Sequence, residues 1–196
     1  RPPKGGQNLV KVLAICHLQR EFIGSIYTQI ESAIDFVLRN IRLGATIDGL
    51  VRKEKYELPP EAIREMIINA HCHRNLLDES CIQVAIYDNR LEVTSPGGLY
   101  NGLTYEEVMN GHSKIRNKAI ANIFSQMGLV EAWGSGIKRI LNAAKEYGLP
   151  EPKFQEFDNM FRVELFRNFL PMTSENKHIG ETSEKHRRNI GETWNS

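Results

Sequence analysis

The sequence has no long apolar run, few cysteines and no excess of charge of either sign. No apolar stretch approaches the roughly 18 to 20 residues that cross a bilayer, and the first residues lack the apolar core of a signal peptide. Three cysteines, Cys16, Cys72 and Cys81, make no disulfide framework and suit a reducing compartment. A net charge of +1, from 25 basic and 24 acidic residues, argues against a domain that coats nucleic acid or anionic lipid. We therefore expect a cytoplasmic protein with no membrane partner.

Three common ligand-binding motifs are also missing. No segment matches G-x-x-x-x-G-K-[ST], and Gly134-Ser135-Gly136 lacks the third glycine of a dinucleotide fingerprint. There is no C-x-x-C or H-x-x-x-H pair, and His71 and His73, two apart on a predicted helix, point to nearly opposite sides. These absences exclude P-loop and Rossmann sites and disfavour a zinc site.

The composition fits one domain with tails. Of 196 residues, 41% are hydrophobic and 25% charged, which is enough to build a core without disulfides or a metal. Because the chain opens without methionine, we expect a piece of a longer protein. We assign residues 1–25 to a strand and linker from an upstream module, 26–167 to the domain, and 168–196 to a polar linker or tail toward a downstream DNA-binding module. The charges of residues 172–196 cancel, so a basic DNA arm is disfavoured.

Hydrophobic periodicity predicts helices and strands along most of the domain. Helices are expected at residues 26–43, stopped by Gly44, and at 60–73, 117–127 and 137–148, with a short one that Thr104 and Glu107 cap in a T-x-x-E box. Strands are expected at 9–16, 45–55 with a bend at Gly49, 82–86, 91–94, 153–157 and 160–166. Residues 98–114, polar and dotted with glycine, are a candidate lid. The pattern predicts an α/β two-layer sandwich: a mixed, mostly antiparallel sheet with helices on one face.

One face of the helix at 60–73 carries a polar stripe with four-residue spacing, formed by Glu61, Glu65, Asn69 and His73. Glu65 and Asn69 lie one turn apart and project in the same direction. A carboxylate and an amide oxygen in this arrangement can share a magnesium ion and its water. Alternatively, the stripe is the solvated face of a surface helix.

Gly134-Ser135-Gly136 opens another predicted helix. Unpaired backbone amides and the positive end of the helix dipole favour phosphate there, and the glycines allow close approach. The alternative is a glycine-rich turn alone. Lys114, Arg116 and Lys138 are nearby cations that can offset phosphate charge, although such side chains are mostly solvated. Trp133 and Phe124 can be read as base-stacking aromatics, but a core position is favoured.

Four motifs occur in one order along the chain. They are residues 58–74 (LPPEAIREMIINAHCHR), 89–98 (NRLEVTSPGG), 113–117 (SKIRN) and 131–137 (EAWGSGI). This order resembles the GHKL ATPases, the fold shared by gyrase, Hsp90, histidine kinases and MutL. More narrowly, residues 26–167 resemble the divergent GHKL domain at the C-terminal side of Schlafen-AlbA-type transcriptional regulators. That domain is often labelled as related to the C-terminus of the ATP-dependent DNA helicase RecG.

The resemblance implies a role for most matched residues. Glu65 would be the general base that activates water, and Asn69 the magnesium ligand that ties the metal to the phosphates. Ser95 stands where the wider superfamily has an aspartate that accepts a hydrogen bond from the adenine amino group; a hydroxyl accepts that bond without charge assistance. The other residues that the resemblance places around the nucleotide are His73, Arg74, Gly97, Gly98, Arg116, Gly134, Ser135 and Gly136. No role is assigned to the His73-Arg74 pair.

The resemblance implies that the domain binds ATP with Mg²⁺, and that any hydrolysis is slow and serves a switch in a transcriptional regulator. The alternative is a non-catalytic interaction or dimerisation domain that has kept the fold and lost the nucleotide, which Ser95 favours. The expected partners are a nucleotide, a second copy of the chain, and DNA only through neighbouring modules. Unwinding of DNA by this segment alone is disfavoured because it carries no P-loop motor.

Overall fold

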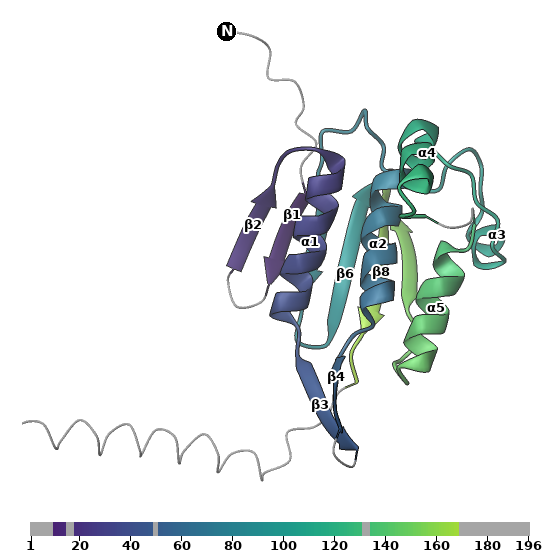
Figure 1. Ribbon diagram of the computed structural model, residues 1–196. Coiled ribbons are helices and arrows are strands. Elements are labelled where there is room, and N and C mark those ends of the chain that lie inside the picture. Colours follow the sequence, from purple (N-terminus) through teal and green to yellow (C-terminus); the bar gives the residue numbers. More distant parts are fainter. Residues whose placement is uncertain (1–9, 15–17, 49–50, 131–133, 169–196) are drawn as a thin grey trace, which may run out of the picture.

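The computed structural model describes residues 10–14, 18–48, 51–130 and 134–168 (Figure 1). The predictions for Gly49, Trp133, the tail and both ends of the strand at 9–16 therefore lie outside the described residues. Figure 1 shows a main sheet with the helices α1, α2 and α5 on one face of it. The predicted two-layer α/β architecture is confirmed.

The main sheet has six strands in the order β2-β1-β5-β6-β8-β7. The pair β1–β5 is parallel and the other neighbouring pairs are antiparallel, as expected for a mixed, mostly antiparallel sheet. The strands are β1 (Val10–Ala14), β2 (Leu18–Phe22), β5 (Ile82–Ile86), β6 (Arg90–Pro96), β7 (Lys153–Phe157) and β8 (Met160–Phe166). The strand β6 continues through Ser95 and Pro96, where the sequence suggested a break.

The strands β1 and β2 fall within residues 1–25, which we assigned to an upstream module. In the structure they are two of the six strands of the main sheet, and Val10 and Val12 are fully buried in its core. The parallel register of β1 with β5 places Val12 beside Val84. The strand β2, with the sequence LQREF, was not predicted. An exposed edge strand needs no alternation of apolar and polar residues, so it leaves no hydrophobic pattern in the sequence. This stretch of the N-terminal segment therefore folds with the domain.

The described residues form five helices: α1 (Ile26–Asn40), α2 (Pro60–His73), α3 (Tyr105–Met109), α4 (Lys118–Gln126) and α5 (Gly136–Glu146). The predicted capping box at Thr104 and Glu107 is present at the start of α3. The helix α1 ends at Asn40, earlier than predicted, because Leu43–Asp48 (β3) pairs with Val51–Tyr56 (β4) as a separate two-stranded sheet. Gly44 is therefore part of β3 and does not stop the helix, and the single strand predicted at 45–55 is a hairpin.

The helix α2 lies at the centre of the helical layer. It begins at Pro60, where a proline needs no hydrogen-bond partner for its nitrogen. The predicted apolar face is confirmed: Ala62, Ile63, Met66, Ile67 and Ala70 are buried. Full burial of each large aliphatic side chain stabilises the fold by about 1.5–3 kcal/mol. Phe124 of α4 belongs to the same core and is not exposed for base stacking.

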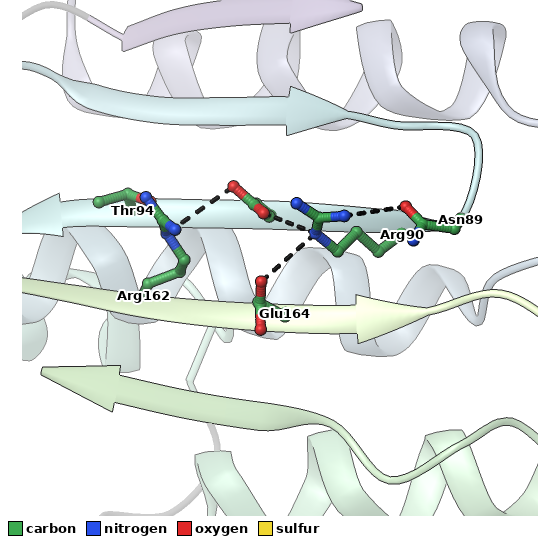
Figure 2. Close-up of polar contacts among 6 residues, drawn as sticks. Asn89, Arg90, Thr94, Arg162 and Glu164 are labelled. Carbon is green, nitrogen blue, oxygen red and sulfur yellow. Dashed lines mark hydrogen bonds and ion pairs between the residues drawn. The ribbon is translucent and has the colours of Figure 1, made fainter. Parts of the chain in front are cut away.

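The face of the sheet away from the helices carries a network of charged side chains, which we call the sheet-face network (Figure 2). It consists of Arg90, Glu92, Thr94, Arg162 and Glu164. Arg90 Nε lies 2.6 Å from Glu92 Oε1 and 3.3 Å from Glu164 Oε1. Arg162 Nε lies 3.7 Å from Glu92 Oε2 and donates to Thr94 Oγ1 at 3.1 Å. Two cations thus balance two carboxylates.

Candidate functional site

A cavity of about 130 Å³ lies between the sheet, α2, α5 and the segment 97–115. A single water needs only about 10–15 Å³ measured in this way, so the cavity has room for part of an organic ligand. Most of its lining is apolar, and the polar side chains Glu65, Asn69, His73 and Ser95 also reach it. An apolar cavity with a few convergent polar groups is typical of a small-molecule site.

The floor of the cavity comes from the middle and one edge of the sheet. Val93 of β6, Val163 of β8 and Phe154 of β7 lie in register in one row. Ser95 and Phe161 form the next row. Because alternate residues of a strand share one face, these side chains point to the helical layer while Glu92 and Thr94 point to the opposite face. The floor offers a flat apolar surface with one hydroxyl.

Glu65 and Asn69 lie side by side on the cavity wall, as their spacing predicts. Asn69 Nδ2 donates to Glu65 Oε1 at 3.1 Å. Arg139 of α5 lies on the other side, with Nη1 at 3.5 Å from Glu65 Oε2. We call these three residues the cavity cluster. Glu65 is only 8% exposed, so it does not belong to a solvated stripe.

Burial sets the protonation behaviour of Glu65. It raises the pKa of the carboxyl above its ordinary value, and the Arg139 guanidinium and the Asn69 hydrogen bond oppose that rise. A carboxylate with a raised pKa accepts protons more readily near neutral pH. Glu65 is therefore a candidate proton acceptor beside the cavity.

In the Gly134-Ser135-Gly136 turn, Gly136 meets this wall directly and Gly134 meets the backbone of Gly111. A Cβ on Gly136 would lie 2.5 Å from both Asn69 Nδ2 and Glu65 Oε1. Gly134 has φ +82°, and a Cβ there would lie 2.7 Å from the carbonyl oxygen of Gly111. Gly134 thus requires glycine, a side chain at Gly136 would displace the ends of Glu65 and Asn69, and the N-terminus of α5 abuts the cavity cluster. Ser135 is the N-cap of α5 but makes no side-chain cap hydrogen bond.

Ser95 is buried at the floor of the cavity. Its Oγ donates to the carbonyl oxygen of Ala70 in α2 at 3.0 Å. Because the hydroxyl proton is used in this bond, the oxygen presents only acceptor lone pairs to a ligand. Ser95 thus keeps the acceptor character of the expected aspartate without its charge.

The roof of the cavity begins at Gly97 and Gly98, which the turn between β7 and β8 holds in place. Gly97 N–H donates to Asn159 O at 2.7 Å, and Leu99 N–H donates to Glu156 Oε1 at 3.0 Å. A Cβ on Gly98 would lie 1.9 Å from the same Glu156 oxygen. The two glycines therefore line the cavity, and they also allow the backbone to pass close to protein side chains.

Arg116 and Asn117 bind the C-terminal end of α2. The last carbonyl oxygens of this helix, which a helix leaves unpaired, all accept hydrogen bonds from these two residues. The acceptors are His71, Cys72, His73 and Arg74, at donor–acceptor distances of 2.7 to 3.3 Å. The arginine cation also complements the negative end of the helix dipole. Sequence reasoning missed the role of Asn117, although the SKIRN motif contains it.

Arg116 also holds the roof. Its Nη2 donates to Gly98 O at 2.7 Å, and its guanidinium lies 4.8 Å from the centre of the Tyr100 ring. Neither Arg116 nor Arg74 is among the residues that line the cavity. Arg74 is buried, and its Nη2 donates to Ser80 O at 2.7 Å. The structure thus gives both arginines partners within the protein, where the resemblance implied contact with a nucleotide.

Other polar groups lie in the lining of the cavity or near it. His73 lines it, and burial lowers the pKa of its ring below the ordinary value. Lys114 lines it too and donates from Nζ to Asn101 O at 3.0 Å. Lys138 is exposed, beside Gly111 of the roof. These three side chains, together with His112 and Ser113 of the lining, are polar groups at or near the cavity that can meet an anion.

The described residues show neither a cluster of metal ligands nor a membrane-spanning helix. No three His, Cys, Asp or Glu side chains there are grouped so that they could hold a metal ion. In the same part of the chain no helix has the length and apolar character that crossing a bilayer requires.

Comparison with known proteins identifies a matching family and similar solved structures. Residues 79–165 match the family described as "Putative ATP-dependent DNA helicase recG C-terminal". This match confirms the resemblance to a divergent GHKL-type domain and indicates an ATPase-like family. No curated protein matches the chain.

The crystal structure of the DIP2311 protein from Corynebacterium diphtheriae is similar, with a TM-score of 0.70 and 25% identity. The similarity covers 82% of this chain and 34% of that one. The chain therefore spans about a third of the length of this structural relative.

Proposed function

We propose that this domain binds ATP together with Mg²⁺ in the cavity, and that it hydrolyses ATP slowly. One observation carries the proposal: Gly136, at the N-terminus of α5, abuts both Glu65 and Asn69 at the wall of an apolar cavity. This arrangement unites a base, an oxygen ligand and a glycine-lined helix start. The match to a family described as ATP-dependent supports the same ligand.

The residues fit each part of such a ligand. The apolar floor suits a purine ring, and the Ser95 oxygen, restricted to accepting, suits an amino group better than a carbonyl. Adenine carries an amino group at the position where guanine carries a carbonyl, so we expect ATP to bind more tightly than GTP. At the other end, α5 begins without an acidic residue in its first turn, so its backbone amides can receive phosphate.

Asn69 would hold the metal ion through its carboxamide oxygen. Mg²⁺ prefers oxygen ligands and, when bound, supplies positive charge to phosphate oxygens. Glu65 accepts a proton from water, and the amides at the start of α5 stabilise charge that develops on phosphate. Both oxygens of Glu65 already have partners in the cavity cluster, which is consistent with slow turnover.

Slow turnover suits a switch. We propose that nucleotide binding under the segment 97–115 changes how this domain meets a second copy or a neighbouring DNA-binding module of a cytoplasmic transcriptional regulator. The near-zero net charge supports DNA contact outside this segment.

A thermal-shift and calorimetry series with ATP, ADP and GTP, with and without Mg²⁺, tests the proposal. We expect ATP with Mg²⁺ to raise the melting temperature most, because a ligand of the native state stabilises it by mass action. Equal or absent shifts with all three nucleotides would overturn it. For hydrolysis, a Glu65→Ala protein that releases phosphate as fast as the wild type would remove the catalytic assignment.

The alternative is an interaction or dimerisation domain that has lost nucleotide binding. The neutral Ser95 and the internal partners of Arg74 and Arg116 favour it. Oligomeric state distinguishes the two functions: the alternative expects a dimer that does not respond to ATP, and our proposal expects one that does.

A further inference from the structure

We propose that Arg139 is a positioning residue of this site: it holds Glu65 so that Glu65 fixes the carboxamide of Asn69 for metal binding. The inference rests on the proposed function, and it names a side chain that neither the sequence motifs nor the family description assigns. Its basis is the order of contacts in the cavity cluster, which runs from α5 to α2.

The first contact anchors Glu65. Arg139 Nη1 lies 3.5 Å from Glu65 Oε2, and the Arg139 side chain is mostly buried. An arginine can only donate hydrogen bonds and a carboxylate can only accept them. Because Arg139 lies against Oε2 of Glu65, Oε1 is left to accept from Asn69. Arg139 lies one turn after Gly136, whose backbone abuts Glu65 from the same helix. The helix α5 therefore fixes Glu65 at two points.

The second contact orients Asn69. A carboxylate can only accept hydrogen bonds, so Glu65 Oε1 draws the amino side of the Asn69 carboxamide toward itself, at 3.1 Å. The carboxamide is planar, with its oxygen and nitrogen on opposite sides, so its oxygen is turned away from Glu65. That oxygen is the atom that would bind Mg²⁺. Without a fixed Glu65, the carboxamide is free to present either side.

Neighbours of a metal ligand that hold it in this way commonly change metal affinity by about 10- to 100-fold. We expect Arg139 to act on the magnesium-dependent part of ATP binding. A direct contact between Arg139 and a phosphate would instead strengthen binding with and without the metal. The two roles therefore predict different results.

The experiment measures the dissociation constant for ATP by calorimetry, in Mg²⁺ and in EDTA, for the full chain. The variants are Arg139→Gln, which removes the charge, Arg139→Lys, which keeps it, and Asn69→Ala. Lys145→Gln is the matched control, because Lys145 is an exposed cation in the last turn of the same helix.

We expect Arg139→Gln to weaken binding in Mg²⁺ by about 10- to 100-fold and to leave binding in EDTA unchanged. Arg139→Lys should recover most of the loss, and Lys145→Gln should behave as wild type. In the Asn69→Ala background, Arg139→Gln should have no further effect, because the group it positions is gone. Equal losses in Mg²⁺ and EDTA, or additive losses in the double variant, would overturn the proposal.

A second readout needs no nucleotide. The side-chain amide signals of Asn69 in ¹H–¹⁵N spectra, assigned by their loss in Asn69→Ala, report its hydrogen bond. Arg139→Gln and Glu65→Gln should shift them, and Lys145→Gln should not. If the wild-type protein binds no ATP but the Asn69 amide signals shift in these variants, the proposed function fails while the positioning role stands. If the Asn69 amide signals of folded Arg139→Gln protein match those of the wild type, the positioning role is rejected.

Discussion

The cavity cluster and the sheet-face network lie on opposite faces of the same sheet, and both bury carboxylates. Glu92 and Glu164 are 4% and 9% exposed, and Glu65 is 8% exposed. In the sheet-face network, two arginines contact two carboxylates, the shortest distance being 2.6 Å. In the cavity cluster, the nearest guanidinium nitrogen is 3.5 Å from Glu65, and the other contact is a neutral amide.

The two groups of residues differ in the strength of the contacts that their carboxylates make. A buried polar network in which every member has a partner stabilises a single arrangement, whereas a desolvated carboxylate with weaker partners costs free energy. The raised pKa of Glu65 reflects that cost. The network thus fits a structural role and the cluster, with a cavity beside it, fits a binding role.

The largest effect on ATP binding should come from filling the space at the cavity cluster. In Gly136→Ala, the added Cβ would lie 2.5 Å from Asn69 Nδ2 and Glu65 Oε1, so both side chains must move. A misplacement of about 1 Å can cost a catalytic site roughly 100-fold in rate, and the groups displaced here are those proposed to hold the metal ion and the phosphates. We therefore expect ATP affinity to fall by about that factor, or about 2.7 kcal/mol, in a calorimetric titration.

Gly44→Ala is the control for this change. Gly44 lies in β3, and a Cβ there would meet only Lys55 O at an ordinary 3.5 Å. ATP affinity should be unchanged in Gly44→Ala. If Gly136→Ala also bound ATP as the wild type does, the cavity cluster would not be part of the site.

The pH dependence of stability should be dominated by a third buried group, His71. Burial lowers the pKa of its ring to about 4, against the effect of its hydrogen bond to Ile67 O. The unfolded chain binds the proton near pH 6.5, so His71 contributes its full stability above that pH, and the contribution is lost as pH falls toward 4. The free energy of unfolding should drop by roughly 3 kcal/mol over this range.

Chemical denaturation of wild type and His71→Asn at several pH values measures this effect. The variant keeps an amide donor for Ile67 O but cannot take up a proton. We expect its stability to vary less between pH 6.5 and 4. An equally steep dependence in His71→Asn would assign the acid sensitivity to other groups. The stabilities of variants in the cavity cluster and in the sheet-face network should be compared above pH 6.5, where His71 is neutral in the folded and the unfolded chain.

Residues within one helix turn could be predicted from the sequence, since helix geometry alone places Glu65 beside Asn69. The Gly134-Ser135-Gly136 turn could be recognised as the start of a helix for the same reason, because the backbone angle φ and the helix dipole depend on neighbouring residues alone. The partner of Glu65 was not: Arg139 lies 74 positions away, and only the packing of α2 on α5 brings it near. The cap of α2 by Arg116 and Asn117 was missed for the same reason.

The fold shows the same limit. Strands with alternating apolar residues were predicted well, but β2 lacks that alternation because it is an exposed edge, and its pairing with β1 defines it. The β3–β4 hairpin was taken for one strand, since the pairing of β3 with β4 is not recorded in the local sequence. Tertiary pairing, which no local pattern records, decided these elements.

Stability should depend on the sheet-face network more than on the cavity cluster. Glu92→Gln keeps the volume but leaves Arg90 and Arg162 without their shared carboxylate. Hydrogen bonds to charged groups contribute about 1.5–3 kcal/mol, so we expect a loss of about 2 kcal/mol in urea denaturation. The control is Glu21→Gln, in an exposed pair with Lys11, which should cost at most about 0.5 kcal/mol. Equal losses in the two variants would show that the network contributes no more than a surface pair.

The smallest stability change should follow Glu65→Gln, in spite of similar burial. Loss of the ion pair with Arg139 is offset by removal of a desolvated charge, so the free energy of unfolding should change by less than about 1 kcal/mol. Phosphate release should nevertheless fall by about 100-fold or more, because an amide cannot take a proton from water. Replacing a residue that serves binding or catalysis typically lowers activity and changes stability little. If Glu65→Gln lost as much stability as Glu92→Gln, Glu65 would instead be a structural carboxylate like those of the sheet-face network.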